Sequence, residues 1–155
     1  MVKKDPSYWL MKSEPEAYSI ETLEKEKETI WDGIRNYQAR NFMRQMEIGD
    51  KAFFYHSNCK PPGIVGFMEV IDLNIIDPTQ FQKGSAYYDP KSSHQNPRWD
   101  CVKVKYISKS NKILSLPELK LIFSEDELLV VKKGNRLSIL PVLQKSANLL
   151  ISKLK

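Results

Sequence analysis

The residue types best suited to chemistry are concentrated between Trp31 and Asn41, in the run WDGIRNYQARN. The run combines two aromatic side chains, two arginines and three carboxamides around a predicted helix start. An aromatic face can stack on a nucleic-acid base, which contributes on the order of 1–3 kcal/mol by alanine substitution. Asn and Gln match base edges with paired donors and acceptors, and Arg35, Arg40 and Arg44 can reach phosphates. The pattern indicates a base-binding site, with a core tryptophan beside a solvated arginine face as the open alternative.

Two further clusters place aromatic and polar residues together at predicted strand ends. In FFYHSN, residues 53–58, Ser57 and Asn58 can contact a ligand at the mouth of a barrel strand, or simply form a turn. In NPRW, residues 96–99, Trp99 can form a second wall of the pocket or cover the end of the barrel. The residues alone leave both pairs of alternatives open.

Metal binding and catalysis have less support in the sequence. The side chains that suit zinc follow no paired-ligand spacing, so no metal or cofactor is predicted: His56, Cys59, His94 and Cys101. Ser13 or Ser57 has a lysine, glutamate or histidine nearby. However, no nucleophile elbow, paired carboxylates or phosphate-cradling glycine loop accompanies them. A protein that is not an enzyme is therefore expected.

Composition narrows the class of protein. The chain has 155 residues and reads as one domain, residues 1–155, with 41% hydrophobic and 28% charged residues. Its net charge of +5 favours polyanions, although only weakly. Two cysteines suit a reducing compartment. Because no apolar stretch approaches the roughly 18 residues needed to span a bilayer, and no signal peptide or basic run is seen, we expect a soluble cytoplasmic protein, nuclear if eukaryotic.

The elements that must position these residues follow from apolar periodicity and turn residues. Strands are predicted at residues 8–12, 51–56, 64–71, 100–107 and 136–140. Helices are predicted after caps at Ser19 and Asn36, as a turn after Asp77, at residues 116–122, and over the final segment. Residues 125–131 suit a helix or a strand, and residues 82–98 a long functional loop. This mixture predicts an α+β domain, a partly closed β-barrel with flanking short helices.

Several motifs together resemble the EVE domain, a member of the PUA-like superfamily related to the YTH domain. They are YWLMKSEP from Tyr8, WDGIRNYQARN from Trp31, FYHSN from Phe54, GIVGFMEV from Gly63, YYDP from Tyr87, NPRW from Asn96 and RLSILPV from Arg136. They occur in the family's order over nearly the whole chain. The resemblance implies a PUA-like mixed β-barrel that holds a modified base, a methylated or otherwise modified cytosine or adenine.

The same resemblance assigns roles to individual residues. Trp31 matches a tryptophan of the base-binding cage. The other expected base contacts are Ser13, Asn36, Ser57, Asn58 and Trp99, and the expected phosphate or rim residues are Lys12, Arg35, Arg40, Arg98, Arg136 and Ser138.

The expected partner is modified DNA or RNA, as a single strand or a flipped base, because extracting a base from a duplex costs a few kcal/mol. The oligomeric state is left open, and a monomer is compatible with the sequence. Two alternatives stand beside this one: an enzyme acting on a modified nucleoside or amide through Lys12 and Glu14, and a small-molecule-binding module.

Overall fold

Six strands form one mixed sheet in the computed structural model, which describes residues 5–154. They are β1 (Tyr8–Ser13), β2 (Glu28–Ile30), β3 (Lys51–His56), β4 (Gly63–Ile76), β5 (Asp100–Ser115) and β6 (Ile139–Val142). The order across the sheet is β2-β5-β4-β3-β1-β6. β1 and β3 run parallel, and the other neighbouring strands run antiparallel. The predicted α+β class is confirmed.

The helices are short and begin where side chains cap them. They are α1 (Ile20–Glu26), α2 (Tyr37–Gln45), α3 (Leu116–Ile122) and α4 (Gln144–Lys153), with 3-10 turns η1 (Pro78–Phe81) and η2 (Leu129–Val131). The predicted caps are confirmed: the Ser19 side chain accepts from the Thr22 amide, and the Asn36 side chain accepts from the Ala39 amide. Both helix starts therefore follow directly from the local sequence.

The sheet does not close into a barrel, which corrects the predicted architecture. β2 and β6 form its two edges, and no pairing joins them within residues 5–154. Consecutive residues of β3 explain the difference, because Phe54 packs into one apolar cluster with Trp31 and Phe53 into another with Leu119. Each face of the sheet is thus covered separately, the first by α1 and α2, and the second by α3, η2 and α4.

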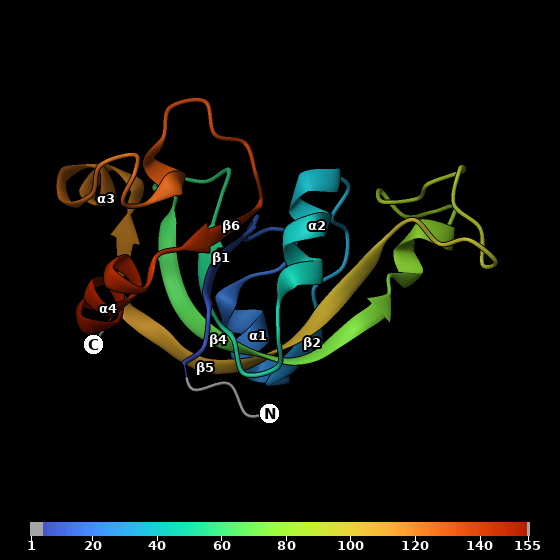
Figure 1. The fold of residues 1–155 in the computed structure, drawn as a ribbon, viewed down its shortest axis with the longest axis horizontal. Helices are drawn as coiled ribbons and strands as arrows, with labels where there is room; N and C mark the ends of the chain where they lie inside the picture. The colour runs from blue at the N-terminus through green and yellow to red at the C-terminus, as the bar shows by residue number, and fades with distance from the viewer. Residues whose placement is uncertain (1–4, 155) are drawn as a thin grey trace.

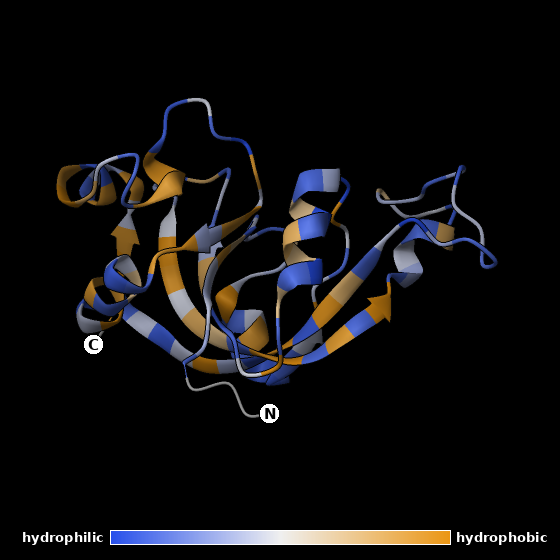
Figure 2. Ribbon diagram, viewed as in Figure 1, coloured by the Kyte–Doolittle hydropathy of each residue, from blue (hydrophilic) through white to orange (hydrophobic). Residues whose placement is uncertain are grey.

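β4 and β5 form a long curved ribbon that crosses the whole molecule, with α3 near one end and residues 82–98 at the other (Figure 1). Both strands are longer than predicted. Hydrophobic and hydrophilic residues alternate along them, as Figure 2 shows. Gly66 marks a close approach, because a Cβ there would lie 2.4 Å from the Ile20 side chain.

Two local predictions need correction, and one strand was not predicted. β2 was not predicted, and it exists because its three residues pair with Lys103–Lys105 of β5. The strand predicted at residues 136–140 lies at Ile139–Val142, where β6 pairs with β1. Residues 125–131 form a turn and the 3-10 turn η2 instead of a full helix or a strand.

Between residues 5 and 154, no helix has the length and apolar character required to cross a membrane.

Candidate functional site

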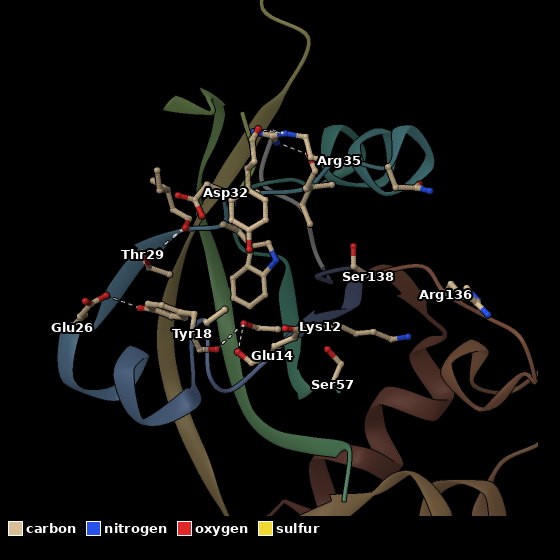
Figure 3. A pocket seen from close by; sticks show the side chains of 18 residues that line it. Lys12, Glu14, Tyr18, Glu26, Thr29, Asp32, Arg35, Ser57, Arg136 and Ser138 are labelled. Carbon is tan, nitrogen blue, oxygen red and sulfur yellow. Dashed lines mark hydrogen bonds between the residues drawn. The ribbon is translucent and has the colours of Figure 1, made fainter. Parts of the chain in front are cut away.

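A pocket of about 960 Å³ opens beside the carboxyl ends of β1 and β3 (Figure 3). Five separate parts of the chain form its walls: the end of β1 with the following turn, residues 26–36, Ser57, Tyr87, and the segment before β6. Its lining residues are Lys12, Ser13, Glu14, Ala17, Tyr18, Glu26, Thr29, Ile30, Trp31, Asp32, Gly33, Ile34, Arg35, Asn36, Ser57, Tyr87, Arg136 and Ser138.

Backbone hydrogen bonds bring these distant segments together. The Ser57 amide donates to the Ser13 carbonyl over 3.0 Å, because β1 and β3 are parallel and end at the same edge. The Lys12 amide donates to the Ser138 carbonyl over 2.8 Å, which fixes the segment before β6. The Trp31 amide donates to the Val102 carbonyl of β5 over 2.8 Å. The pocket is therefore assembled on the rigid sheet.

Trp31 belongs both to the pocket wall and to the hydrophobic core. It is 6% exposed and packs edge to face on Phe54, with ring centroids 5.2 Å apart. A ring in that position has little free surface. The base-binding and core alternatives for Trp31 are therefore not exclusive, since the same side chain supports the core and lines the pocket.

Gly33 and Tyr87 meet at the next part of the wall. Gly33 has a φ of 83°, and a Cβ at this position would lie 2.8 Å from the Tyr87 ring. Arg35 holds Tyr87 from the other side, because its Nε donates to the Tyr87 carbonyl over 2.8 Å. Loop 82–98 thus contributes to the pocket through Tyr87, which lines it.

The buried Asp77 side chain holds Gly33 and Arg35 in place. Its carboxylate is almost fully buried and accepts from the Gly33 amide over 2.8 Å, and it forms an ion pair with Arg35 at 3.0 Å. Burial alone would raise the pKa of Asp77, but hydrogen bonds from Thr79, Gly33 and Arg35 outweigh burial and lower the pKa. Arg35 is therefore held by protein groups. The phosphate contact that the sequence predicts for Arg35 would use a guanidinium that is already paired with Asp77.

Acidic and basic side chains both line the pocket. In the view of Figure 3, Glu26 and Asp32 lie on one side, and Arg136 lies on the opposite side. Glu26 accepts from the Tyr18 hydroxyl over 2.7 Å. Desolvation and the neighbouring charge of Asp77 raise the pKa of Asp32. Burial lowers the pKa of Lys12.

The structure places most, but not all, of the predicted small polar residues at the pocket. Ser13, Asn36 and Ser57 line the pocket, as does the predicted rim residue Ser138. The Ser13 hydroxyl donates to the Tyr18 carbonyl over 2.6 Å, so its proton is already used. Asn58 does not line the pocket: it has a φ of 51°, and its amide donates to Glu14 over 3.2 Å.

Trp99, Arg40 and Arg98 also lie outside the pocket lining. Trp99 is buried beside the start of α2, where its ring stacks on Tyr37 with centroids 4.8 Å apart and its Nε1 donates to Asp89 over 2.7 Å. Arg40 covers the Tyr37 ring and donates to the Arg98 carbonyl over 2.8 Å. These three residues form a stacked layer that joins α2 to loop 82–98.

Several lining residues were not among those predicted from the sequence. Asp32 and Gly33 lie inside the WDG motif that was recognised, and Tyr87 begins the YYDP motif, so those motifs were the available signal. Tyr18, Glu26 and Thr29 belong to no motif and reach the pocket only through the fold. Within residues 5–154, no three His, Cys, Asp or Glu side chains are grouped as a metal site would require.

Comparison with known proteins shows the family of the chain. The model of the EVE domain matches residues 7–153. The chain belongs to the EVE family. Human thymocyte nuclear protein 1 is 41% identical over 97% of this chain and 75% of its own length. The rat protein is 49% identical over 74% of this chain and 55% of its own length, so this chain spans only about half of that relative.

Solved structures of EVE-like proteins agree with the fold. A protein from Pseudomonas putida has a TM-score of 0.90 at 42% identity, covering 96% of this chain and 99% of its own. The human THYN1 protein, solved in complex with 5-methylcytosine containing DNA, has a TM-score of 0.87 at 41% identity. That match covers 94% of this chain and 96% of the human one.

Proposed function

We propose that this EVE domain is a non-enzymatic module that binds nucleic acid and holds one modified base in the pocket around Trp31. The observation that carries the proposal is the pocket itself, which combines an aromatic wall, polar groups and basic residues at one edge. The similar human protein bound to 5-methylcytosine containing DNA supports modified DNA as the partner. The relatives are named nuclear proteins, which favours a nuclear location for this chain in a eukaryotic cell.

The chemistry of the walls suits a base. Tyr87, which is 38% exposed, and the small free part of the Trp31 ring supply aromatic surface. Ser57, Ser138 and Asn36 supply donors and acceptors for a base edge. Lys12 and Arg136 are placed to hold flanking phosphates, which adds affinity without sequence choice. A single strand or a flipped base suits the pocket best, since a stacked base cannot enter it.

Replacing Trp31 tests the pocket assignment. Trp31→Leu keeps an apolar side chain under the pocket but removes the aromatic surface. We expect binding to an oligonucleotide with one 5-methylcytosine to weaken about tenfold or more, in line with the free energy of base–aromatic stacking. Binding to the unmodified strand should change far less. Fluorescence anisotropy with matched DNA and RNA strands measures both.

Trp99→Leu is the matched control, because Trp99 is a similarly buried tryptophan outside the pocket lining. It should lower thermal stability without changing the preference for the modified base. An equal loss of modified and unmodified binding in Trp31→Leu would contradict the assignment.

One observation favours an enzyme as the second candidate. Lys12 lines the pocket, and burial lowers its pKa, which makes a neutral amine more accessible than on the surface. Product formation from free modified nucleosides, lost in Lys12→Met, would favour this candidate over the binding module.

A further inference from the structure

One carboxylate of the pocket lining has no side-chain donor. Glu26 accepts from Tyr18, Glu14 accepts from Asn58, and the nearby Asp77 is saturated by Arg35, Thr79 and Gly33. Asp32 lines the same pocket, directly after Trp31. The Asp32 carboxylate accepts from its own backbone amide, and among residues 5–154 no side chain forms a hydrogen bond or ion pair with it.

We propose that Asp32 determines specificity by accepting a hydrogen bond from the exocyclic amine of the bound base. The pocket would then take amine-bearing bases, the cytosine and adenine derivatives, in preference to thymine and uracil. This inference rests on the proposed function, because it names the class of base that the same pocket reads.

The chemical argument starts from what an ionised carboxylate can do. It has acceptors only, so it matches the N4 amine of cytosine or the N6 amine of adenine, whereas thymine presents the O4 acceptor at the corresponding position. Two acceptors facing each other lose both of their water contacts without gaining a bond. A single carboxylate oxygen aimed at that position therefore discriminates between the two classes.

The distribution of charge gives the base an orientation. Arg136 lies across the pocket from Asp32 in Figure 3, and the other arginine of the lining, Arg35, is already bonded to Asp77 and Thr79. The phosphates of a nucleotide would be held on the side of Arg136 and Lys12, which directs the edge of the base towards Asp32. Desolvation and the charge of Asp77 raise the pKa of Asp32, while its own backbone amide and Arg35 act in the opposite direction, as a bound amine would.

Three single-stranded oligonucleotides that differ at one position test the inference: one carries 5-methylcytosine, one thymine and one cytosine. The first two share the 5-methyl group and differ only along the N3 and C4 edge. We expect the native protein to prefer 5-methylcytosine to thymine by about tenfold, as one hydrogen bond to a charged group provides. Asp32→Asn should bring that ratio close to one, because a carboxamide also donates to O4.

Control variants separate this role from general damage. Asp126→Asn makes the same change at an exposed aspartate outside the pocket lining, so it should keep the 5-methylcytosine to thymine ratio. Asp32→Ala should lose the ratio as Asp32→Asn does, which shows that removal of the acceptor is responsible.

Two outcomes overturn the inference in different ways. If the native protein prefers 5-methylcytosine to cytosine but Asp32→Asn leaves the thymine ratio unchanged, Asp32 does not read the amine and the proposed function stands. If the native protein binds all three strands equally, the proposed function fails, and the role of Asp32 fails with it.

Discussion

At the scale of single residues, most pocket side chains also serve the structure. Trp31 packs on Phe54, Arg35 pairs with the buried Asp77, and Asn36 caps α2. A substitution at any of them changes stability as well as the pocket. Asp32 differs because no side chain within residues 5–154 forms a hydrogen bond or ion pair with its carboxylate, which makes it the cleaner probe of ligand recognition.

His56 provides a pH-dependent test at the residue scale. It is buried, and its Nε2 accepts from the Ile20 amide at the start of α1 over 3.1 Å, so the fold requires the neutral ring. Burial lowers the pKa of His56 below its ordinary value of 6.5, while Glu21 acts weakly in the opposite direction. The unfolded chain therefore binds more protons than the folded chain once the pH falls below 6.5.

The expected result is a loss of folding free energy over the pH interval just below 6.5, at no more than about 1.4 kcal/mol per pH unit for one proton. Urea unfolding at several pH values measures it. His56→Gln should flatten the dependence over this interval, and His94→Gln, at an exposed position, should retain it. If the folding free energy of the native protein is constant over this interval, protonation of His56 does not affect it.

At the scale of elements, the pocket depends on how residues 31–36 and loop 82–98 are fixed to each other. Gln80 is fully buried and organises the loop: its carboxamide oxygen accepts from Ser92, Arg98 and Trp99, and its nitrogen donates to the carbonyls of Asp77 and Trp99. The loop is long, yet its hydrogen bonds hold Tyr87 against Gly33.

Gly33→Ala tests that contact. Two effects add at this position, the left-handed φ of 83° and a Cβ only 2.8 Å from the Tyr87 ring. Gly134→Ala is the control, since Gly134 has nearly the same φ of 82° and open space around it. We expect Gly134→Ala to lose about 1 kcal/mol of stability from the backbone alone, and Gly33→Ala to lose more and to weaken binding of the modified base. Thermal unfolding and anisotropy compare the two, and equal effects would place Tyr87 outside the site.

At the scale of the whole molecule, net charge is a weaker guide than the place of each charge. The chain carries a net charge of +5, and several basic residues are paired with acids, as Arg44 is with Asp100 and Lys51 with Glu69. Arg136 is exposed at the pocket edge and has no ion pair within the described part of the chain. Such a residue is suited to a phosphate contact.

The salt dependence of binding tests this role. Each phosphate neutralised on a single strand contributes about 0.7 to the slope of log K against log salt concentration. Arg136→Ala should reduce the slope by about that amount and weaken modified and unmodified strands alike. Lys120→Ala, on α3 and away from the pocket, should leave the slope unchanged. A steep slope that Arg136→Ala does not alter would move the phosphate contact elsewhere.

The sequence by itself determined the local structure and the family. Ser19 and Asn36 cap the helices that follow them, and β3 has its predicted bounds, because these features depend on neighbouring residues. The motifs from Tyr8 to Val142, above all WDGIRNYQARN followed by FYHSN, indicated the EVE family, because they are long and occur in the family's order. Membership of that family also predicted a pocket at Trp31, Ser13 and Ser57, which the structure brings together.

The tertiary structure decided which of the predicted residues share that pocket. Trp99 and Asn58 have types as suitable as Trp31 and Ser57, yet Trp99 stacks on Tyr37 and Asn58 bonds to Glu14. Tyr18 and Tyr87 enter the pocket from segments about 70 residues apart. Strand register, backbone hydrogen bonds and burial set these positions, and all three depend on contacts between residues that are distant in the sequence.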